Sequence, residues 1–286
     1  MNIDGRALAE QLNLQTQQRI GRLPFRPLLV DVLVGNDPAS LSYVGIKQRT
    51  AQKYGLAFEL AHLPADSTTQ EIVDVIEASS KRDELCGLIV QLPLPGHVDQ
   101  IEIINSIPLA VDVDLLNEQS ANGFYANAAD VNGFSLVPPT AGAIMHIIDS
   151  LPEPWDQKQF AVVGRGDLVG MPVAHLLRSR GYKVEVVHSQ TLNPDELLRQ
   201  ADCIILGVGK PNFLNGTQVK DDVIVIDAGT SESGGTIAGD ANFETVSPRA
   251  KFITPVPGGV GPLTVAKLIE NVVAVAEAKV STVDTL

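Results

Sequence analysis

Short apolar runs alternate with segments of helical spacing along most of this 286-residue chain. This alternation is typical of a parallel sheet with helices on both faces, because strands buried on both sides read as continuous apolar runs. In the first half it predicts strands over 28–34, 57–62 and 85–91, with helices over 40–54 and 69–80 between them.

The same pattern resumes after residue 141 and indicates a second domain. It predicts helices over 141–150, 169–180 and 194–200, and strands over 160–163, 183–187, 203–206 and 223–226, with a short strand near Phe252. A final helix over 263–280 should pack back on the first domain, because its Ala/Val face needs a partner. We therefore predict an α/β protein of two domains, 1–138 plus 266–286 and 139–265, with a cleft between them.

The stretch 108–139 shows neither the apolar runs typical of buried strands nor the spacing typical of helices, and it mixes Asp, Asn, Gly and aromatic residues. Structureless connections of this length are uncommon in compact domains. We expect a long active-site connection or a partly irregular insertion here.

The net charge of −13 argues against a nucleic-acid partner, because binding a polyanion requires clustered Lys and Arg. No 18-residue apolar run predicts a membrane span, and the polar N-terminus does not resemble a secretory signal. Cys86 and Cys203 lie in apolar runs, which favours two buried thiols in a reducing compartment. We expect a cytoplasmic protein.

A glycine-containing turn follows the predicted strand 160–163 and opens a helix, as a dinucleotide-binding turn must. It contains Gly164, Arg165, Gly166 and Gly170, and three residues rather than two separate the last pair of glycines. The position of this turn between a strand and a helix therefore supports a dinucleotide site more strongly than the spacing of its glycines does. We predict a Rossmann-type domain over 139–265.

The next strand ends in His188-Ser189-Gln-Thr, with no carboxylate to bind the ribose hydroxyls of NAD. Arg165 in the phosphate turn could accept a 2′-phosphate instead, which favours NADP. His188 has two interpretations, a ligand of the cofactor or a histidine that caps its own loop. Gly229 and Thr230, after the strand 223–226, are expected to line the same groove.

Residues 255–262 contain three prolines and three glycines. Proline restricts φ and withholds a backbone donor, whereas glycine allows backbone that side chains forbid. Such a loop can press its N–H groups against a flat ligand, although it could also cross between domains without binding anything.

Tyr43 and Lys47 are four residues apart on a predicted helix and so share one face. Such a pair usually lies on a solvated face, but this helix follows the first strand, so the pair could face the carboxyl edge of the sheet. Gln91 ends another strand there and is either a cap or an amide directed at a ligand. Asp114, in the irregular stretch, could face solvent or ligand.

Together these segments resemble the methylenetetrahydrofolate dehydrogenase/methenyltetrahydrofolate cyclohydrolase family. The resemblance runs from Asp4-Gly5 through Tyr43-x-x-x-Lys47, Val90-Gln-Leu-Pro-Leu-Pro95 and Gly164-Arg165 to Pro255–Pro262. It implies that 1–138 plus 266–286 binds folate and that 139–265 binds NADP. The implied reactions are oxidation of 5,10-methylenetetrahydrofolate to 5,10-methenyltetrahydrofolate and hydrolysis of that product to 10-formyltetrahydrofolate.

The resemblance also implies residue roles. Lys47 is the acid/base residue, Gln91 orients it, Tyr43 stacks on or bonds the pterin, and Asp114 binds the pterin's amino edge. The other implied substrate contacts are Leu92, Pro257, Gly258 and Gly261. The implied cofactor contacts are Thr140, Gly164, Arg165, Gly166, His188, Ser189, Gly229, Thr230 and Thr264. No metal is implied, and members are typically homodimers.

The chain departs from the family pattern near Asp114. The family usually has a glycine after this aspartate, whereas this chain has Leu115. If that position needs positive φ, leucine would be strained by about 1–2 kcal/mol, so we expect a changed local backbone. Alternatives are a dehydrogenase that has lost hydrolysis or acts on another pterin carrier, or a non-catalytic nucleotide sensor or interaction module. The presence of Tyr43 and Lys47 argues against the sensor.

Overall fold

The computed structural model describes residues 1–126, 136–233 and 236–283, and these form two compact units. The 140–264 unit also contains Met1–Glu10, and the 11–139 unit also contains Val265–Leu286. Both are α/β units with a parallel sheet, the predicted fold class. Over the described ranges, no helix combines the length and hydropathy that crossing a membrane requires.

The first ten residues belong with 140–264, whereas we expected them in the other domain. Main-chain pairing explains the difference. The N–H of Ile3 donates to the carbonyl of Ile253, and the N–H of Ile253 donates to that of Met1. The N-terminus therefore lies along β10 (Ala250–Ile253) like an additional strand.

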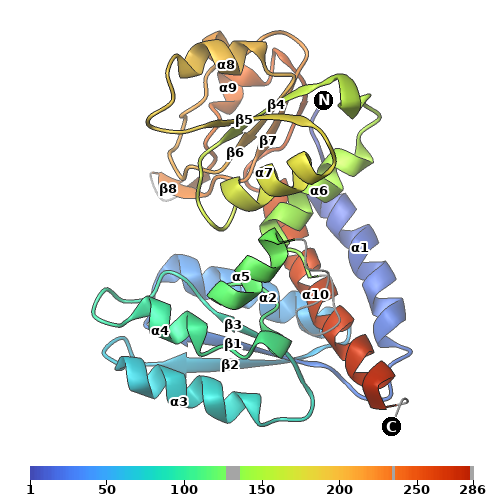
Figure 1. Ribbon diagram of the computed structural model, residues 1–286, viewed down its shortest axis with the longest axis vertical. Coiled ribbons are helices and arrows are strands. Elements are labelled where there is room, and N and C mark those ends of the chain that lie inside the picture. Colours follow the sequence, from blue (N-terminus) through green and yellow to red (C-terminus); the bar gives the residue numbers. More distant parts are fainter. Residues whose placement is uncertain (127–135, 234–235, 284–286) are drawn as a thin grey trace. The chain divides into compact units, whose positions relative to one another are not determined.

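The 11–139 unit contains a three-stranded parallel sheet in the order β2-β1-β3. Its strands are β1 (Leu28–Val34), β2 (Ala57–Leu63) and β3 (Leu85–Val90), each within one residue of the prediction. The connecting helices are α2 (Pro38–Lys53) and α3 (Thr69–Ser80), and α3 covers one face of the sheet (Figure 1). The central strand β1 is buried along its whole length.

Helices α2 and α10 (Val260–Val283) cover the opposite face of this sheet. Ala51 of α2 and Val272 of α10 pack in one cluster with Leu29 of β1. The prediction that the last helix packs on the first domain is therefore confirmed.

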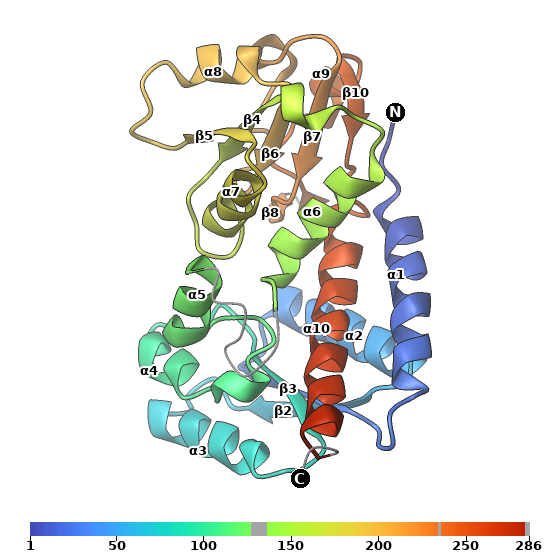
Figure 2. The same ribbon diagram turned by 45° about the vertical axis from the view of Figure 1, so that its right-hand side comes forward.

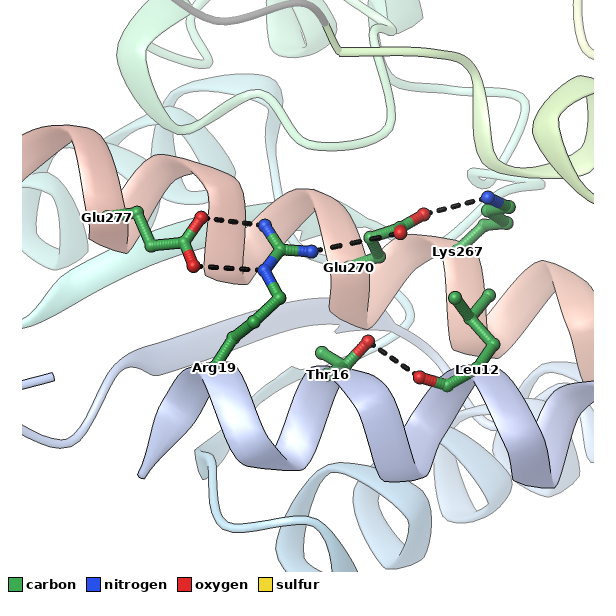
Figure 3. A network of polar contacts seen from close by, with 6 residues as sticks. All are labelled: Leu12, Thr16, Arg19, Lys267, Glu270 and Glu277. Atoms are coloured by element: carbon green, nitrogen blue, oxygen red, sulfur yellow. Dashed lines mark hydrogen bonds and ion pairs between the residues drawn. The ribbon is translucent and has the colours of Figure 1, made fainter. Parts of the chain in front are cut away.

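Helix α1 (Gly5–Ile20) was not predicted, because polar residues occupy much of its buried face. Among its buried side chains are Leu12, Asn13 and Thr16. Figure 3 shows how its last turn is tied to α10: Arg19 makes a paired hydrogen bond to Glu277, at 2.9 and 2.7 Å, and approaches Glu270 at 3.7 Å. The ion pairs of Arg19 thus help to hold α1 against α10, because the apolar stripe of α1 is weak.

The 140–264 unit contains a five-stranded parallel sheet in the order β10-β7-β6-β4-β5. Besides β10 its strands are β4 (Gln159–Val163), β5 (Lys183–Val187), β6 (Cys203–Leu206) and β7 (Val223–Asp227). Helices α6 (Pro139–Ser150) and α7 (Gly170–Ser179) lie on one side, and α8 (Pro194–Gln200) and α9 (Phe243–Val246) on the other (Figure 2). Strands β8 (Ser231–Ser233) and β9 (Thr236–Ala238) pair separately as an antiparallel ladder.

Strand order reverses at β4, since β5 lies on one side of it and β6 on the other. In open parallel sheets, ligands bind beyond the carboxyl ends of the strands at such a switch point. The glycine-containing turn follows β4 and therefore occupies this position.

The stretch 108–139 is more regular than expected where it is described. It contains a 3₁₀ turn, η1 (Leu109–Val111), and helix α5 (Glu118–Tyr125), and it is preceded by α4 (Gln100–Asn105). Residues 127–135 lie outside the described part of the chain.

The expected change of backbone at Leu115 was wrong. Leu115 has φ of 55°, so it adopts the left-handed conformation that glycine adopts without strain. The turn is held by the buried carboxylate of Asp112, which accepts hydrogen bonds from the N–H groups of Leu116 and Asn117 at 3.1 and 2.9 Å. The surrounding turn thus holds leucine in a conformation that is unfavourable for it.

This conformation predicts an unusual order of stability for substitutions at residue 115. Glycine in place of alanine normally destabilises an ordered segment by about 0.5–1 kcal/mol. Here Leu115→Gly should be more stable than Leu115→Ala by about 1 kcal/mol. Both variants lose the leucine side chain, but only alanine still has a Cβ that is strained at positive φ. Urea unfolding of the two variants measures the difference, and the opposite order would show that position 115 is not strained.

Candidate active site

Lys47 is the centre of the candidate site. Its side chain is 3% exposed, and its Nζ lies 2.6 Å from Oδ2 of Asp31 and donates to Oε1 of Gln91 at 2.8 Å. A buried lysine needs such partners, because an isolated buried ammonium is very costly. The lysine is therefore held between β1 and the end of β3.

Local sequence explains why Lys47 points inward. Asp37 caps α2 by accepting a hydrogen bond from the N–H of Ser40 at 2.8 Å, and Pro38 occupies the first turn. The helix that begins here buries Ser40, Val44, Lys47 and Ala51, a stripe of helical period. Lys47 thus occupies a core-facing position of an otherwise small or apolar stripe.

Tyr43 lies one turn before Lys47, and the Nζ of Lys47 is 5.5 Å from the centre of its ring. This distance is within the range of a cation–π contact. The structure confirms the predicted shared face. It excludes a fully solvated one, since Lys47 is buried and Tyr43 is partly buried.

Gln91 follows β3 directly and is anchored at both ends. Its backbone N–H donates to Val32 at 2.9 Å, and its side-chain Nε2 donates to the carbonyl of Leu92 at 2.6 Å. This second bond directs the amide oxygen toward Lys47. Gln91 is therefore more than a strand cap: its amide is fixed against the lysine.

Asp31 was missed by the sequence analysis. It lies in the middle of β1, and its side chain is fully buried. The available signal was a charged residue inside the run Leu-Leu-Val-Asp-Val-Leu-Val, since aspartate is rarely fully buried unless it is paired.

Asp114 completes a group of five side chains, called here the Lys47 cluster: Asp31, Tyr43, Lys47, Gln91 and Asp114. The pKa of Asp114 is raised to about 6, chiefly by burial; the charge of Lys47 lowers it, and the negative charges of Asp112 and Asp31 raise it. Burial also raises the pKa of the Tyr43 phenol, and the charges of Asp114 and Asp31 add to this. These couplings place Asp114 in the electrostatic environment of the other members.

The glycine-containing turn in the 140–264 unit has the close packing of a nucleotide-binding turn. Gly164 has φ of 104°, and a side chain at Gly170 would collide with the Gly164 carbonyl. Both glycines are therefore required by strand–turn–helix packing, as in a Rossmann turn. Arg165 and Gly166 are exposed, and Arg165 makes no ion pair with any described residue.

The predicted cofactor residues after β5 form a small loop. The N–H of His188 donates to Oγ1 of Thr191 at 2.9 Å, and Nδ1 of His188 accepts from the N–H of Gln190 at 3.2 Å. His188 thus caps its own loop, one of its two interpretations, while Ser189 is exposed. After β7, Gly229 is buried and Thr230 is exposed at the same edge of the sheet.

The proline- and glycine-rich loop packs on the start of α1. A side chain at Gly5 would collide with the carbonyl of Gly259. Part of the loop's glycine content is thus explained by backbone packing inside the chain. Pro257 and Gly258 remain accessible and line a hollow with Pro255, Arg6 and residues 2–4.

The remaining predicted contacts lie at the starts of helices. Thr140 is in the first turn of α6, and Gly261 and Thr264 are in the first turns of α10. The hydroxyl of Thr264 donates to the carbonyl of Val260 at 3.3 Å. Gly261 is exposed, and a side chain there would meet no neighbouring atom.

Two family models cover most of the chain. Residues 3–114 match the tetrahydrofolate dehydrogenase/cyclohydrolase catalytic domain, and residues 138–280 match the NAD(P)-binding domain of the same family. The chain belongs to this family. All members of the Lys47 cluster lie within the first match, and the glycine-containing turn lies within the second.

Relatives and solved structures agree with the family models. The "Bifunctional protein FolD" of Halothermothrix orenii is 35% identical over 274 residues, which is 95% of this chain and 96% of the relative. That of Anaplasma phagocytophilum is 37% identical over 286 residues, 95% of this chain and 90% of the relative.

Two crystal structures have the same fold over nearly the whole chain. The bifunctional FolD dehydrogenase/cyclohydrolase of Campylobacter jejuni has a TM-score of 0.90 at 33% identity, covering 97% of this chain and 98% of its own. The Trypanosoma brucei enzyme, complexed with NADP cofactor and inhibitor, has a TM-score of 0.91 at 30% identity, covering 98% of both chains.

The raised pKa of Asp114 predicts a pH-dependent effect of Asp114→Asn on stability. Between pH 4 and pH 6 the folded carboxyl binds more protons than the unfolded one, so its contribution to stability falls as pH rises through this window. The variant's free energy of unfolding, relative to wild type, should therefore be higher at pH 8 than at pH 4, by about 1–2 kcal/mol. Denaturant unfolding at both pH values measures it, with Asp66→Asn as the control for loss of one charge. An equal difference at both pH values would contradict the burial of this charge.

Proposed function

We propose that this protein oxidises 5,10-methylenetetrahydrofolate to 5,10-methenyltetrahydrofolate with NADP and then hydrolyses the product to 10-formyltetrahydrofolate. The observation that carries the proposal is the buried amine of Lys47, held by Gln91 inside the segment that matches the family's catalytic domain. The full-length similarity to proteins named bifunctional FolD supports both activities.

The oxidation requires a dinucleotide at the carboxyl edge of the five-stranded sheet. The tight packing of Gly164 against Gly170 fits such a ligand, and so does the charge of Arg165, which has no ion-pair partner among the described residues. NADP supplies the hydride acceptor when it is bound. Thr140, Gly166, His188, Ser189, Gly229, Thr230 and Thr264 are the other proposed contacts of the cofactor.

The folate side requires mainly recognition and alignment. We assign Asp114 to the amino edge of the pterin, because a carboxylate accepts hydrogen bonds from donor-rich groups. Tyr43 offers a ring for stacking beside it. Leu92, Pro257, Gly258 and Gly261 are the further proposed substrate contacts.

The hydrolysis requires proton transfer, for which Lys47 is placed. Water adds its oxygen to the methenyl carbon while one of its protons passes to a base. The bond from that carbon to N5 then breaks and N5 takes up a proton, so that the formyl group remains on N10 and one proton is released overall. Lys47 is the proposed acid/base residue, and Gln91 orients it.

Preference for NADP over NAD is assigned to Arg165. No carboxylate follows β5 to bind the ribose hydroxyls of NAD, and the exposed guanidinium can accept a 2′-phosphate. The assignment agrees with the NADP complex of the Trypanosoma brucei relative.

Three broader features belong to the same proposal. We assign folate binding to 1–138 plus 266–286 and NADP binding to 139–265, with Met1–Glu10 packed in the unit that contains the latter. We infer a homodimer from the family resemblance. The free, buried thiols of Cys86 and Cys203 support a reducing compartment such as the cytoplasm.

The proposal predicts that Lys47→Met separates the two activities. With methylenetetrahydrofolate and NADP, the variant should still form NADPH but accumulate the methenyl compound, because hydrolysis loses its acid/base residue. General acid–base groups contribute about 10²–10⁴-fold. Following the NADPH and methenyl absorbances together measures both steps, with Lys81→Met as the control. Undiminished hydrolysis by the variant would remove Lys47 from the mechanism, and a wild type that never hydrolyses would be a monofunctional dehydrogenase.

A second prediction concerns cofactor choice. Arg165→Gln should raise the KM for NADP about tenfold or more and leave the KM for NAD nearly unchanged, because only NADP carries the 2′-phosphate. Lys183→Gln is a matched control, since it removes a positive charge at the opposite, amino end of β5. Equal effects of Arg165→Gln on both cofactors would refute the assignment.

A further inference from the structure

We propose that Asp31 is a positioning residue for hydrolysis, which holds the Lys47 nitrogen in place through its charge and stabilises the ammonium formed when this nitrogen takes a proton. The inference rests on the proposed cyclohydrolase function and deepens it. Neither the resemblance nor the family models single out this residue.

The first argument is the position of Asp31 in the sheet. It occupies the middle of the central strand β1, opposite Leu60 of β2 and Ile89 of β3. Its side chain shares the α2-facing side of the strand with Leu29, because alternate residues of a strand point the same way. It therefore meets Lys47 from the floor of the sheet, whereas Gln91 meets it from the end of β3.

The second argument is the energetic cost of this carboxylate. Asp31 is fully buried, and burial raises its pKa while the charge of Lys47 opposes the shift. Neither of its oxygens has a hydrogen-bond partner within the described part of the chain, and Oδ2 meets Lys47 only as an ion pair. A buried ion pair so sparsely hydrogen-bonded contributes little to stability compared with apolar packing. Fold stability alone therefore does not explain an aspartate here.

The third argument is that two strands hold the same nitrogen. Nζ of Lys47 donates a hydrogen bond to Oε1 of Gln91 at 2.8 Å, and Oδ2 of Asp31 lies 2.6 Å from this nitrogen as an ion-pair partner. The nitrogen is thus held by a hydrogen bond from the end of β3 and by the charge of a residue in β1.

The charge of Asp31 has a separate effect from its position. The ionisable groups facing Lys47 are Asp31 from β1, Tyr43 from α2 and Asp114 from the segment after η1. Only Asp31 makes an ion pair with Lys47 among the described residues. When Lys47 accepts a proton from the attacking water, this carboxylate is the nearest compensating charge.

Asp31→Asn tests the charge, because asparagine keeps the shape and an acceptor oxygen. We expect kcat for hydrolysis of methenyltetrahydrofolate to fall about tenfold or more, with KM changed less than about threefold. The rate–pH profile should move to lower pH by about one unit, because removing the carboxylate makes protonation of the lysine less favourable. A far-UV circular dichroism spectrum like that of the wild type confirms that the variant is folded. The control Asp66→Asn removes an exposed carboxylate from the same unit and should keep wild-type rates and profile.

If the wild type hydrolyses methenyltetrahydrofolate but Asp31→Asn has an unchanged kcat and pH profile, the role of Asp31 is overturned and the proposed function stands. Absence of hydrolysis in the wild type would instead overturn both.

A measurement on the unsubstituted protein covers the case in which the variant does not fold. In ¹⁵N-lysine-labelled wild type, with Lys47→Met to assign the signal, the Nζ protons of Lys47 should exchange with solvent more slowly than those of exposed lysines. Exchange as fast as theirs would overturn the proposed anchoring.

Discussion

All strands of a parallel sheet end at the same edge, and both candidate sites of this protein depend on that constraint. In the 11–139 unit, Gln91 follows one strand and the helix that carries Lys47 follows its neighbour. In the 140–264 unit, the Gly164 turn, the His188 loop and Gly229 follow three strands of one sheet. Residues distant in sequence are thereby gathered without any need for long-range sequence signals.

The Lys47 cluster shows how this fold keeps a charged amine inside an apolar layer. The α2 stripe that buries Val44 and Ala51 also carries Lys47 into the layer between helix and sheet. Gln91 accepts a hydrogen bond from the amine and Asp31 pairs with its charge, and these two partners make the burial tolerable. Such an arrangement is poor for stability but suits proton transfer, because it holds a basic group in one orientation away from bulk water.

Glycine patterns had different physical meanings at different positions. Gly164 and Gly170 are required by close packing of backbone, which the motif had suggested. Gly259 packs against Gly5 of α1, so part of the proline- and glycine-rich loop serves the chain itself rather than a ligand. At Leu115 the reverse holds, because the turn keeps a left-handed conformation although glycine is absent.

The sequence by itself determined the two α/β units, most strand and helix boundaries, and the shared face of Tyr43 and Lys47, because the apolar and helical periods are local signals. The pairing of Gln91 with Lys47 was implied only by the family resemblance. Tertiary structure alone decided three points: Asp31 as the ion-pair partner of Lys47, the placement of Met1–Glu10 beside β10, and the formation of α1. The reason is physical. A buried charge pair, an added strand-like segment and a helix with a polar buried face are stabilised by partners far away in the chain, and no local pattern encodes a distant partner.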